Sequence, residues 1–249
     1  MPRDDVAAVR AAREDPSRVV LEGFHAVKHA LRFDATVERL LTPDRPELLS
    51  LADELAADLT DVLARRAVTV DAPTWRSLGA EGLPTPALAV ALRPEDPATA
   101  GDGAAVLLED PRHLGNLGAC VRVAAAAGAR AVYTTGQADP WHPSAVRAAA
   151  GLHFAVHVER LSGGLPSEPL VAVDPTGEPI GTVELPRDAI FAFGTERHGL
   201  TPQVRDRADL EVSIPMRPGV SSLNLATAVA VVLYTHRGVD GATGTDVRS

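Results

Sequence analysis

The C-terminal part of the chain, residues 104–236, alternates short apolar segments with segments of helical pattern, and this alternation restricts the fold more than any other feature. The apolar segments are hydrophobic at successive positions, as expected of strands that are buried on both faces. Such strands, alternating with helices, are typical of a parallel sheet covered by helices. The sequence therefore predicts an α/β domain, with strands at 104–108, 131–134, 155–158, 170–173, 189–194 and 212–215 and helices at 117–128, 143–150 and 223–236.

Residues 94–103 separate this region from the first part of the chain. They are rich in Pro, Gly and acidic residues, a composition typical of linkers. Before them, strands predicted at 19–23, 37–41, 66–70 and 88–92 and helices predicted at 24–31 and 46–65 indicate a smaller α/β domain. We therefore predict a first domain at 1–96, a linker at 97–103 and a larger domain at 104–249.

The composition restricts the classes of protein to which the chain can belong. No apolar run approaches the roughly 20 residues that a membrane helix needs, and the acidic N-terminus lacks the apolar region of a signal peptide, so we expect a cytoplasmic protein without a membrane partner. The formal net charge of −9 argues against a non-specific nucleic-acid binder. Any RNA site must therefore be local, and DNA is not an expected partner.

Cysteine and histidine give no indication of a metal site. The single cysteine, Cys120, excludes an internal disulfide and leaves no second thiol for a zinc cluster or a redox pair. His25 and His29 stand four residues apart on a predicted helix, but no third ligand is evident nearby. We therefore expect no metal.

Three short segments of the larger domain carry glycines and polar side chains at the ends of predicted strands or the starts of helices. Glycine lets the chain turn closely around a ligand, and Ser or Asn at the start of a helix can bond to open backbone N–H groups or to a ligand. Taken alone, each segment has a structural explanation, such as a helix cap at Asn116 and a surface position for Arg122. The segments are 116–122 (NLGACVR), 193–200 (FGTERHGL), and 214–216 (IPM) with 222–224 (SLN).

Other ligand-binding patterns are absent from the sequence. No Gly-x-Gly-x-x-Gly follows a strand, and no Gly-Lys-Ser of the Walker type occurs. A nucleotide-dependent oxidoreductase, the general alternative for an α/β domain, is therefore disfavoured.

In this order, the three segments resemble the three motifs of the SpoU (TrmH-like) branch of the SPOUT methyltransferases, which transfer a methyl group from S-adenosylmethionine to RNA, typically to a ribose 2'-hydroxyl. The second segment matches the family pattern Phe-Gly-x-Glu-x-x-Gly in full, whereas the third has Ala226 where many relatives have a small hydroxyl residue. The resemblance implies a deep trefoil knot in the larger domain and an L30e-like, RNA-binding fold for residues 1–96. It also implies a homodimer that buries the last helix and shares Arg122 between subunits.

By correspondence with these motifs, the resemblance also implies a cofactor, S-adenosyl-L-methionine, and a set of site residues. Because a guanidinium is rarely neutral, we expect Arg122 to bind a phosphate and lower the pKa of the 2'-hydroxyl, although a role as base stays open. Glu196 is expected to pair with an arginine. The catalytic candidates are Asn116, Arg122, Glu196, Ser222 and Asn224, and the cofactor-binding candidates are Gly194, Thr195, Gly199, Ile214, Met216 and Leu223.

Basic and histidine side chains in or beside the motif loops are candidates for local RNA contacts, since arginine binds phosphate and stacks on bases. We expect ribosomal RNA as the substrate, because a domain of this kind precedes the catalytic domain in rRNA-modifying relatives. Transfer RNA, methylation of a base, and a knotted RNA-binding protein without activity stay open as alternatives. The candidate RNA-binding residues are Arg112, His113, Arg122, Arg147, Arg197, His198 and Arg217.

Overall fold

The computed structural model describes residues 2–94, 103–195 and 198–241, which fall into two compact units. The first unit combines residues 1–97 with residues 141–155, and the second combines residues 98–140 with residues 156–249. Most of the predicted linker therefore lies outside the described residues. The predicted domain boundaries and the L30e-like fold stay predictions.

The first unit contains a four-stranded mixed sheet in the order β1-β4-β2-β3. Strand β4 (Leu88–Leu92) lies between β1 (Arg18–Glu22) and β2 (Val37–Thr42) and is antiparallel to both, whereas β3 (Ala67–Thr69) is parallel to β2. These four strands confirm the predicted ones to within two residues. The α-helices within residues 2–94 are α1 (Pro2–Glu14), α2 (Phe24–Arg32), α3 (Arg45–Leu55), α4 (Thr60–Arg66) and α5 (Ala72–Ser77).

The single helix predicted at 46–65 was wrong. Helix α3 ends at Leu55, because Ala56 has a non-helical backbone (φ −165°, ψ 55°), and a 3₁₀ turn leads into α4. Helices α1 and α5 were not predicted, although Asp71 caps α5 by accepting a hydrogen bond from the Thr74 N–H at 2.9 Å, ahead of a proline in the first turn.

Residues 141–155 pack within the first unit although they lie between two strands of the second sheet in the sequence. They form α7 (Pro143–Ala148), which packs on β1, and a 3₁₀ turn that packs on α2. His29 contacts the Ala150 carbonyl oxygen at 2.6 Å through its Nδ1 atom, and Gly151 packs so tightly on the Ala26 backbone that a Cβ would clash. This segment therefore helps to complete the first unit.

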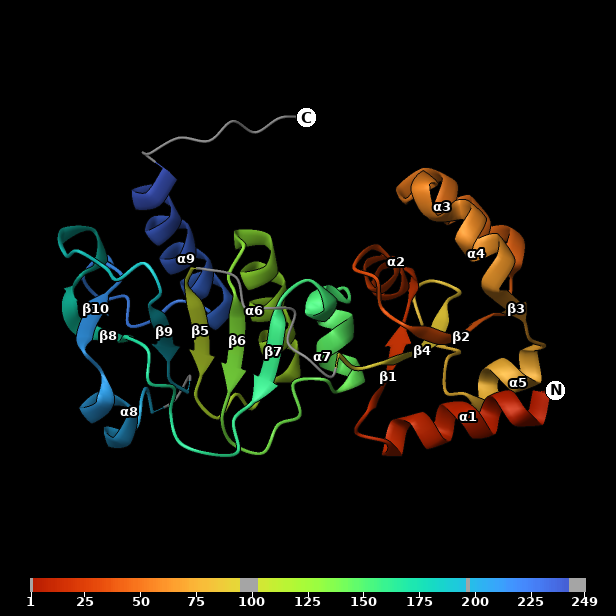
Figure 1. Ribbon diagram of the computed structural model, residues 1–249, viewed down its shortest axis with the longest axis horizontal. Helices are drawn as coiled ribbons and strands as arrows, with labels where there is room; N and C mark the ends of the chain where they lie inside the picture. Colours follow the sequence, from red (N-terminus) through yellow and green to blue (C-terminus); the bar gives the residue numbers. More distant parts are fainter. Residues whose placement is uncertain (1, 95–102, 196–197, 242–249) are drawn as a thin grey trace. The chain divides into compact units, whose positions relative to one another are not determined.

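The second unit contains a six-stranded sheet in the order β10-β8-β9-β5-β6-β7, in which every pair of neighbours is parallel (Figure 1). Strand β9 lies between β8 and β5, so a late segment of the chain occupies the middle of the sheet. The parallel α/β fold predicted from the apolar pattern is confirmed, and the knot stays a prediction. The strands are β5 (Ala105–Leu108), β6 (Ala131–Thr134), β7 (His157–Arg160), β8 (Leu170–Pro179), β9 (Ile190–Phe193) and β10 (Leu210–Ser213).

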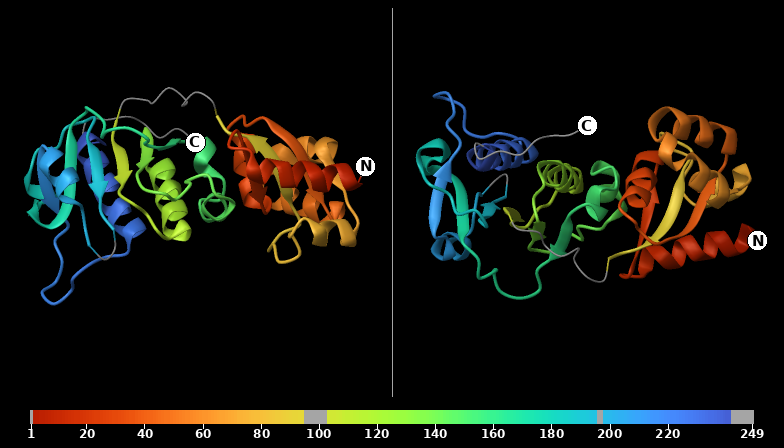
Figure 2. Two further views of the ribbon diagram at one scale, coloured as in Figure 1. Left: turned by 90° about the horizontal axis from the view of Figure 1, so that it is seen from below. Right: turned by 45° about the horizontal axis from the view of Figure 1, so that its top comes forward.

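Helices cover both faces of this sheet. Helices α6 (Leu114–Ala127) and α9 (Leu225–Gly241) pack side by side on one face (Figure 2). On that face, the ring centroids of His236 and Phe191 lie 5.3 Å apart. Helix α8 (Pro202–Arg207) places Val204 among residues of the opposite face, since alternate strand residues point to opposite sides. The sequence prediction missed α8, whose six residues are too few for a clear helical period. No helix in the described part of the chain has the length and apolarity needed to cross a bilayer.

Candidate functional site

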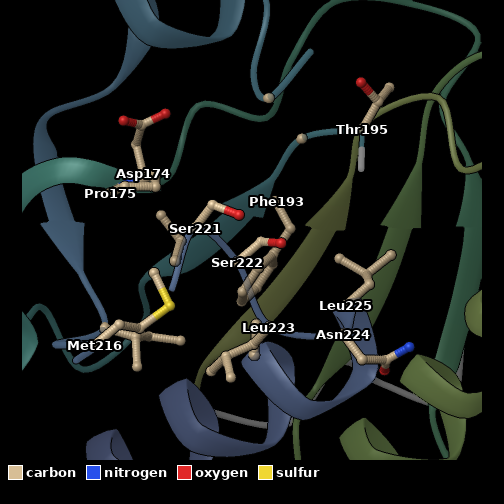
Figure 3. Close-up of a pocket in the computed structure, with 15 residues that line it drawn as sticks. Asp174, Pro175, Phe193, Thr195, Met216, Ser221, Ser222, Leu223, Asn224 and Leu225 are labelled. Atoms are coloured by element: carbon tan, nitrogen blue, oxygen red, sulfur yellow. The ribbon is translucent and has the colours of Figure 1, made fainter. Parts of the chain in front are cut away.

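A cavity of about 520 Å³ opens at the carboxyl edge of the second sheet (Figure 3). The middle of β8, the end of β9, the segment after β10 and the first turn of α9 form its walls. Ligands of open parallel sheets bind at this edge, because loops and helix N-termini converge there. It is lined by Val173, Asp174, Pro175, Phe193, Gly194, Thr195, Gly199, Ile214, Met216, Ser221, Ser222, Leu223, Asn224, Leu225 and Ala228. We call it the large cavity.

The segment after β9 folds back on itself at the wall of the large cavity. Thr195 and Gly199 exchange two backbone hydrogen bonds, at 3.1 and 3.0 Å, and the Thr195 hydroxyl oxygen accepts from the His198 N–H at 3.1 Å. We call residues 193–195 the outgoing arm and residues 198–201 the returning arm. The backbones of the two arms meet at Gly194, where a Cβ would clash with Gly199 and Leu200. A side chain at position 194 is therefore excluded.

Asn224 fixes the start of α9 beside the large cavity. Its Oδ1 atom accepts hydrogen bonds from the N–H groups of Ala226 (3.0 Å) and Thr227 (3.4 Å), which confirms the predicted satisfaction of open backbone groups at this helix. Its Nδ2 atom donates to Oδ1 of Asn116 at 3.4 Å. The first and third motifs are therefore in direct contact.

A second cavity, of about 230 Å³, adjoins the large one, and we call it the small cavity. The two share Phe193, Gly194, Thr195 and Leu225 in their walls. The remaining lining of the small cavity comes from the end of β5, the start of α6 and the returning arm. These residues are Leu108, Glu109, Asp110, Pro111, Arg112, His113, Asn116 and His198.

The structure brings most of the sequence candidates together. All six cofactor-binding candidates line the large cavity, as do Ser222 and Asn224, and Asn116 lines the small one. The alternative interpretation of Asn116 as a helix cap was wrong. Helix α6 begins at Leu114, so His113 is at the cap position and Asn116 lies within the first turn. Among the RNA candidates, Arg112, His113 and His198 line the small cavity, whereas Arg217 is exposed.

Two further candidates that the structure describes lie away from both cavities. Arg122 is exposed on α6 and lines neither cavity. Arg147 was expected beside the motif loops, but it forms an ion pair with Glu22 within the first unit, because α7 packs there. Glu196, with its expected arginine partner, and the RNA candidate Arg197 lie outside the described residues.

Sequence reasoning missed two buried carboxylates at the cavities, Asp174 and Glu109. Burial alone would raise the pKa of Asp174, but hydrogen bonds from Thr176 and the charge of Arg205 outweigh it and hold this pKa below its ordinary range. In the sequence, each of the two residues directly follows a run of apolar residues. In a parallel sheet, the residues after such runs lie at the carboxyl edge, where ligands bind. That position was a signal that could have identified them.

Comparisons with known proteins agree with this geometry. The SpoU rRNA Methylase family matches residues 103–234, which span all three motifs. The 23S rRNA (guanosine(2553)-2'-O)-methyltransferase RlmP of Bacillus subtilis is 29% identical over 91% of this chain and 91% of its own length. An uncharacterized tRNA/rRNA methyltransferase of Synechocystis is 33% identical over 55% of this chain, which spans about half (53%) of that protein.

Among solved structures, the SpoU methyltransferase AviRb from Streptomyces viridochromogenes, in complex with the cofactor AdoMet, has a similar fold. Its TM-score is 0.74 at 24% identity, with 92% of each chain covered. The family match covers more than half of the chain and includes every residue that lines the two cavities. The chain belongs to the SpoU rRNA Methylase family.

Proposed function

We propose that this protein transfers a methyl group from S-adenosylmethionine to a ribose 2'-hydroxyl of ribosomal RNA. The observation that carries the proposal is the convergence of all six cofactor candidates on one cavity, built from the second and third motifs. Relatives named as rRNA 2'-O-methyltransferases support the reaction and the substrate class. We expect this protein to be located in the cytoplasm.

The residues that line the large cavity fit this cofactor by their chemistry. The closely packed arms at Gly194 leave backbone groups at the wall, which can bond to an adenine or an amino-acid end, and Ile214, Met216 and Leu223 provide apolar surface. When bound, the cofactor supplies an electrophilic methyl group on its sulfonium. The residues of this chain then have to orient the cofactor and exclude water from it.

The small cavity is the place from which the ribose hydroxyl would approach. In-line transfer requires the hydroxyl oxygen to be held close to the methyl group, and the two cavities share a wall at Gly194 and Leu225. Asn116 and Asn224 contact each other beside that wall and can hold the ribose and the start of α9. Positioning is therefore their main expected contribution.

Arg122 would act from the partner subunit of a homodimer. It lines neither cavity of its own chain. Three large apolar side chains near or on α9 are exposed in the single chain, namely Val220, Leu223 and Tyr234, at 48%, 39% and 51%. A second subunit on this surface would bury them and place its own Arg122 against the first subunit's site, where a guanidinium stabilises negative charge on the hydroxyl oxygen.

Calorimetry with S-adenosylmethionine tests the first part of the proposal. We expect binding without added metal, and an absence of heat together with an empty cavity in soaked crystals would contradict it. Binding with no methyl transfer to any RNA would favour an RNA-binding protein without activity.

Mapping of modified nucleotides in a deletion strain tests the substrate. We expect one ribose methyl group to be lost from ribosomal RNA. Loss from transfer RNA, or loss of a base methyl group, would identify the alternative substrate or reaction.

Sedimentation of the purified protein tests the dimer. We expect a species of twice the 26.1 kDa chain mass at micromolar concentration. A monomer that methylates RNA would contradict both the dimer and the shared site.

A further inference from the structure

Two buried carboxylates flank Gly194 at the carboxyl edge of the second sheet. Phe193 of β9 is level with Leu108 of β5 on one side and with Val173 of β8 on the other. The next residues along the chain are Glu109, Gly194 and Asp174, in one row across the sheet, where β5 and β9 end and β8 continues beyond them. Glu109 is 8% exposed and Asp174 is 6% exposed. A buried carboxylate is costly unless hydrogen bonds or an opposite charge compensate it, so the partners of each one indicate its role.

Glu109 binds the end of the returning arm. Its Oε2 atom accepts from the Thr201 N–H at 2.8 Å, and its Oε1 atom accepts from the Thr201 hydroxyl at 2.6 Å. The N–H of Glu109 donates to the Phe193 carbonyl oxygen at 2.9 Å, so the same residue also bonds to the outgoing arm. Glu109 therefore connects β5 to both arms, on the side of the small cavity.

Asp174 lies on the other side of Gly194, beside the returning arm. Its Oδ1 atom accepts from the N–H and the hydroxyl of Thr176, at 3.0 and 2.6 Å, and its Oδ2 atom pairs with Arg205 of α8. Oδ2 would lie only 3.8 Å from a Cβ at Gly199, so the carboxylate is directly beside the returning arm. Asp174 therefore connects the middle of β8 to the helix that follows that arm, on the side of the large cavity.

We propose that Glu109 and Asp174 are positioning residues that hold the returning arm against Gly194 from opposite sides and so fix the wall between the cavities. Asp174 sets the shape of the large cavity, and Glu109 that of the small one. The identity of the two ligands rests on the proposed function. The ordering of the arms does not, and it is measurable in the free protein.

The isosteric amides test the proposal, because an amide nitrogen cannot accept the hydrogen bonds that a carboxylate oxygen accepts. Loss of a buried, charge-assisted acceptor corresponds to roughly a 10-fold effect on the ordered state. We expect Asp174→Asn to weaken S-adenosylmethionine binding by about that factor. We expect Glu109→Gln to leave this affinity within a few-fold and to reduce the turnover number with saturating RNA by roughly 10-fold.

Asp209→Asn is the control. The Asp209 carboxylate also accepts a backbone hydrogen bond, from Leu170 at 2.8 Å, and pairs with an arginine, Arg207, but it is exposed, directly precedes β10 and lines neither cavity. We expect this variant to lose thermal stability without a change in cofactor affinity or turnover. An equal loss of affinity in Asp209→Asn and Asp174→Asn would show a general structural effect and overturn the proposal.

Variants of Thr201 test Glu109 without changing its charge. Thr201→Ser keeps both donors and should retain wild-type turnover, whereas Thr201→Val removes the hydroxyl and should share the defect of Glu109→Gln. Equal turnover in the serine and valine variants would contradict the role of Glu109.

Amide exchange in the free protein separates this proposal from the proposed function. The N–H groups of Thr195 and Gly199 are protected by their mutual hydrogen bonds, and both carboxylate variants should accelerate their exchange by roughly 10-fold, unlike Asp209→Asn. Unchanged protection in both variants would overturn the positioning role. If the wild-type protein binds no S-adenosylmethionine, the proposed function fails, and the exchange rates still decide whether the carboxylates order the arms.

Discussion

The two cavities on either side of Gly194 differ in the groups that line them. Apolar side chains, glycines and small polar groups line most of the large cavity, and all its residues come from one stretch of the chain, 173–228. The small cavity carries side chains that bear or can bear charge, including Asp110, Arg112, His113 and His198. A cavity of the first kind can bind its ligand within one chain. The second cavity, which we propose receives the RNA ribose, is not lined by Arg122 of the same chain. Cofactor binding and RNA methylation should therefore be separable by mutation.

Substitution of Arg122 should abolish RNA methylation while leaving cofactor binding nearly unchanged, and this is the largest effect that we expect. Arg122→Ala removes a charge that we assign to the RNA phosphate, and loss of such a group costs on the order of 10²-fold or more in rate. Cofactor affinity, measured by calorimetry, should stay within a few-fold of wild type because Arg122 does not line the large cavity. The exposed Arg187→Ala variant is the control. Near-normal methyl transfer by Arg122→Ala would remove this residue from the catalytic group.

Gly194→Ala should have the opposite effect to Arg122→Ala, because it should weaken cofactor binding directly. Gly194→Ala places a Cβ against the backbone of the returning arm, so that arm must move and distort the large cavity. We expect cofactor affinity to fall by roughly 10- to 100-fold, in line with a backbone strain of a few kcal/mol. Gly164→Ala is the control, since no atom lies within 4 Å of a Cβ there. Wild-type affinity in Gly194→Ala would show that the arms need no close contact.

Asn224 should affect both cavities through the start of α9. Asn224→Ala removes a helix cap and the contact with Asn116, and a lost cap costs about 1 kcal/mol of stability. Asn116→Ala should cost less, because that residue is not a cap. Denaturant unfolding of the two single variants and the double variant measures the coupling between them. Strict additivity would show that the 3.4 Å contact contributes nothing.

The smallest expected effect is a change in the pH dependence of the unfolding free energy at acidic pH. The pKa of Asp174 is lower in the folded protein than in an unfolded chain, where it is near 4. Asp174 therefore contributes stability that is fully present above about pH 4 and is lost as the pH falls through its folded pKa. Asp174→Asn should lose less stability than wild type between neutral pH and about pH 3. Parallel curves of unfolding free energy against pH for the two proteins would contradict this assignment.

The sequence predicted the second sheet well and the cavities only in part. Its strands are runs of apolar residues buried on both faces, such as 105–108 and 190–193, and this pattern is local. Glu109 and Asp174 were missed because their importance depends on strand order and register, which place them beside Gly194 although they lie far apart in the sequence. Strand order is not encoded in the periodicity of any single segment.

The sequence predictions differ from the structure at two further places, where the outcome also was not indicated by the local pattern. The predicted helix at 143–150 was confirmed as α7, yet no local pattern indicates that it packs within the first unit and pairs Arg147 with Glu22. Similarly, the pattern of 46–65 is helical throughout, and it does not indicate the non-helical backbone of Ala56 that separates α3 from α4. Local sequence predicted the elements, whereas tertiary contacts determined their partners and breaks.

The assignment of residues 141–155 to the first unit has a consequence for biosynthesis. The ribosome makes the chain from the N-terminus, so every segment of the first unit is complete before Val173, the first residue of the large cavity, is added. The cavity itself needs residues up to Ala228, and β9 must take its place between strands made earlier. During translation, the first unit can therefore fold while the chain is still unable to hold a cofactor.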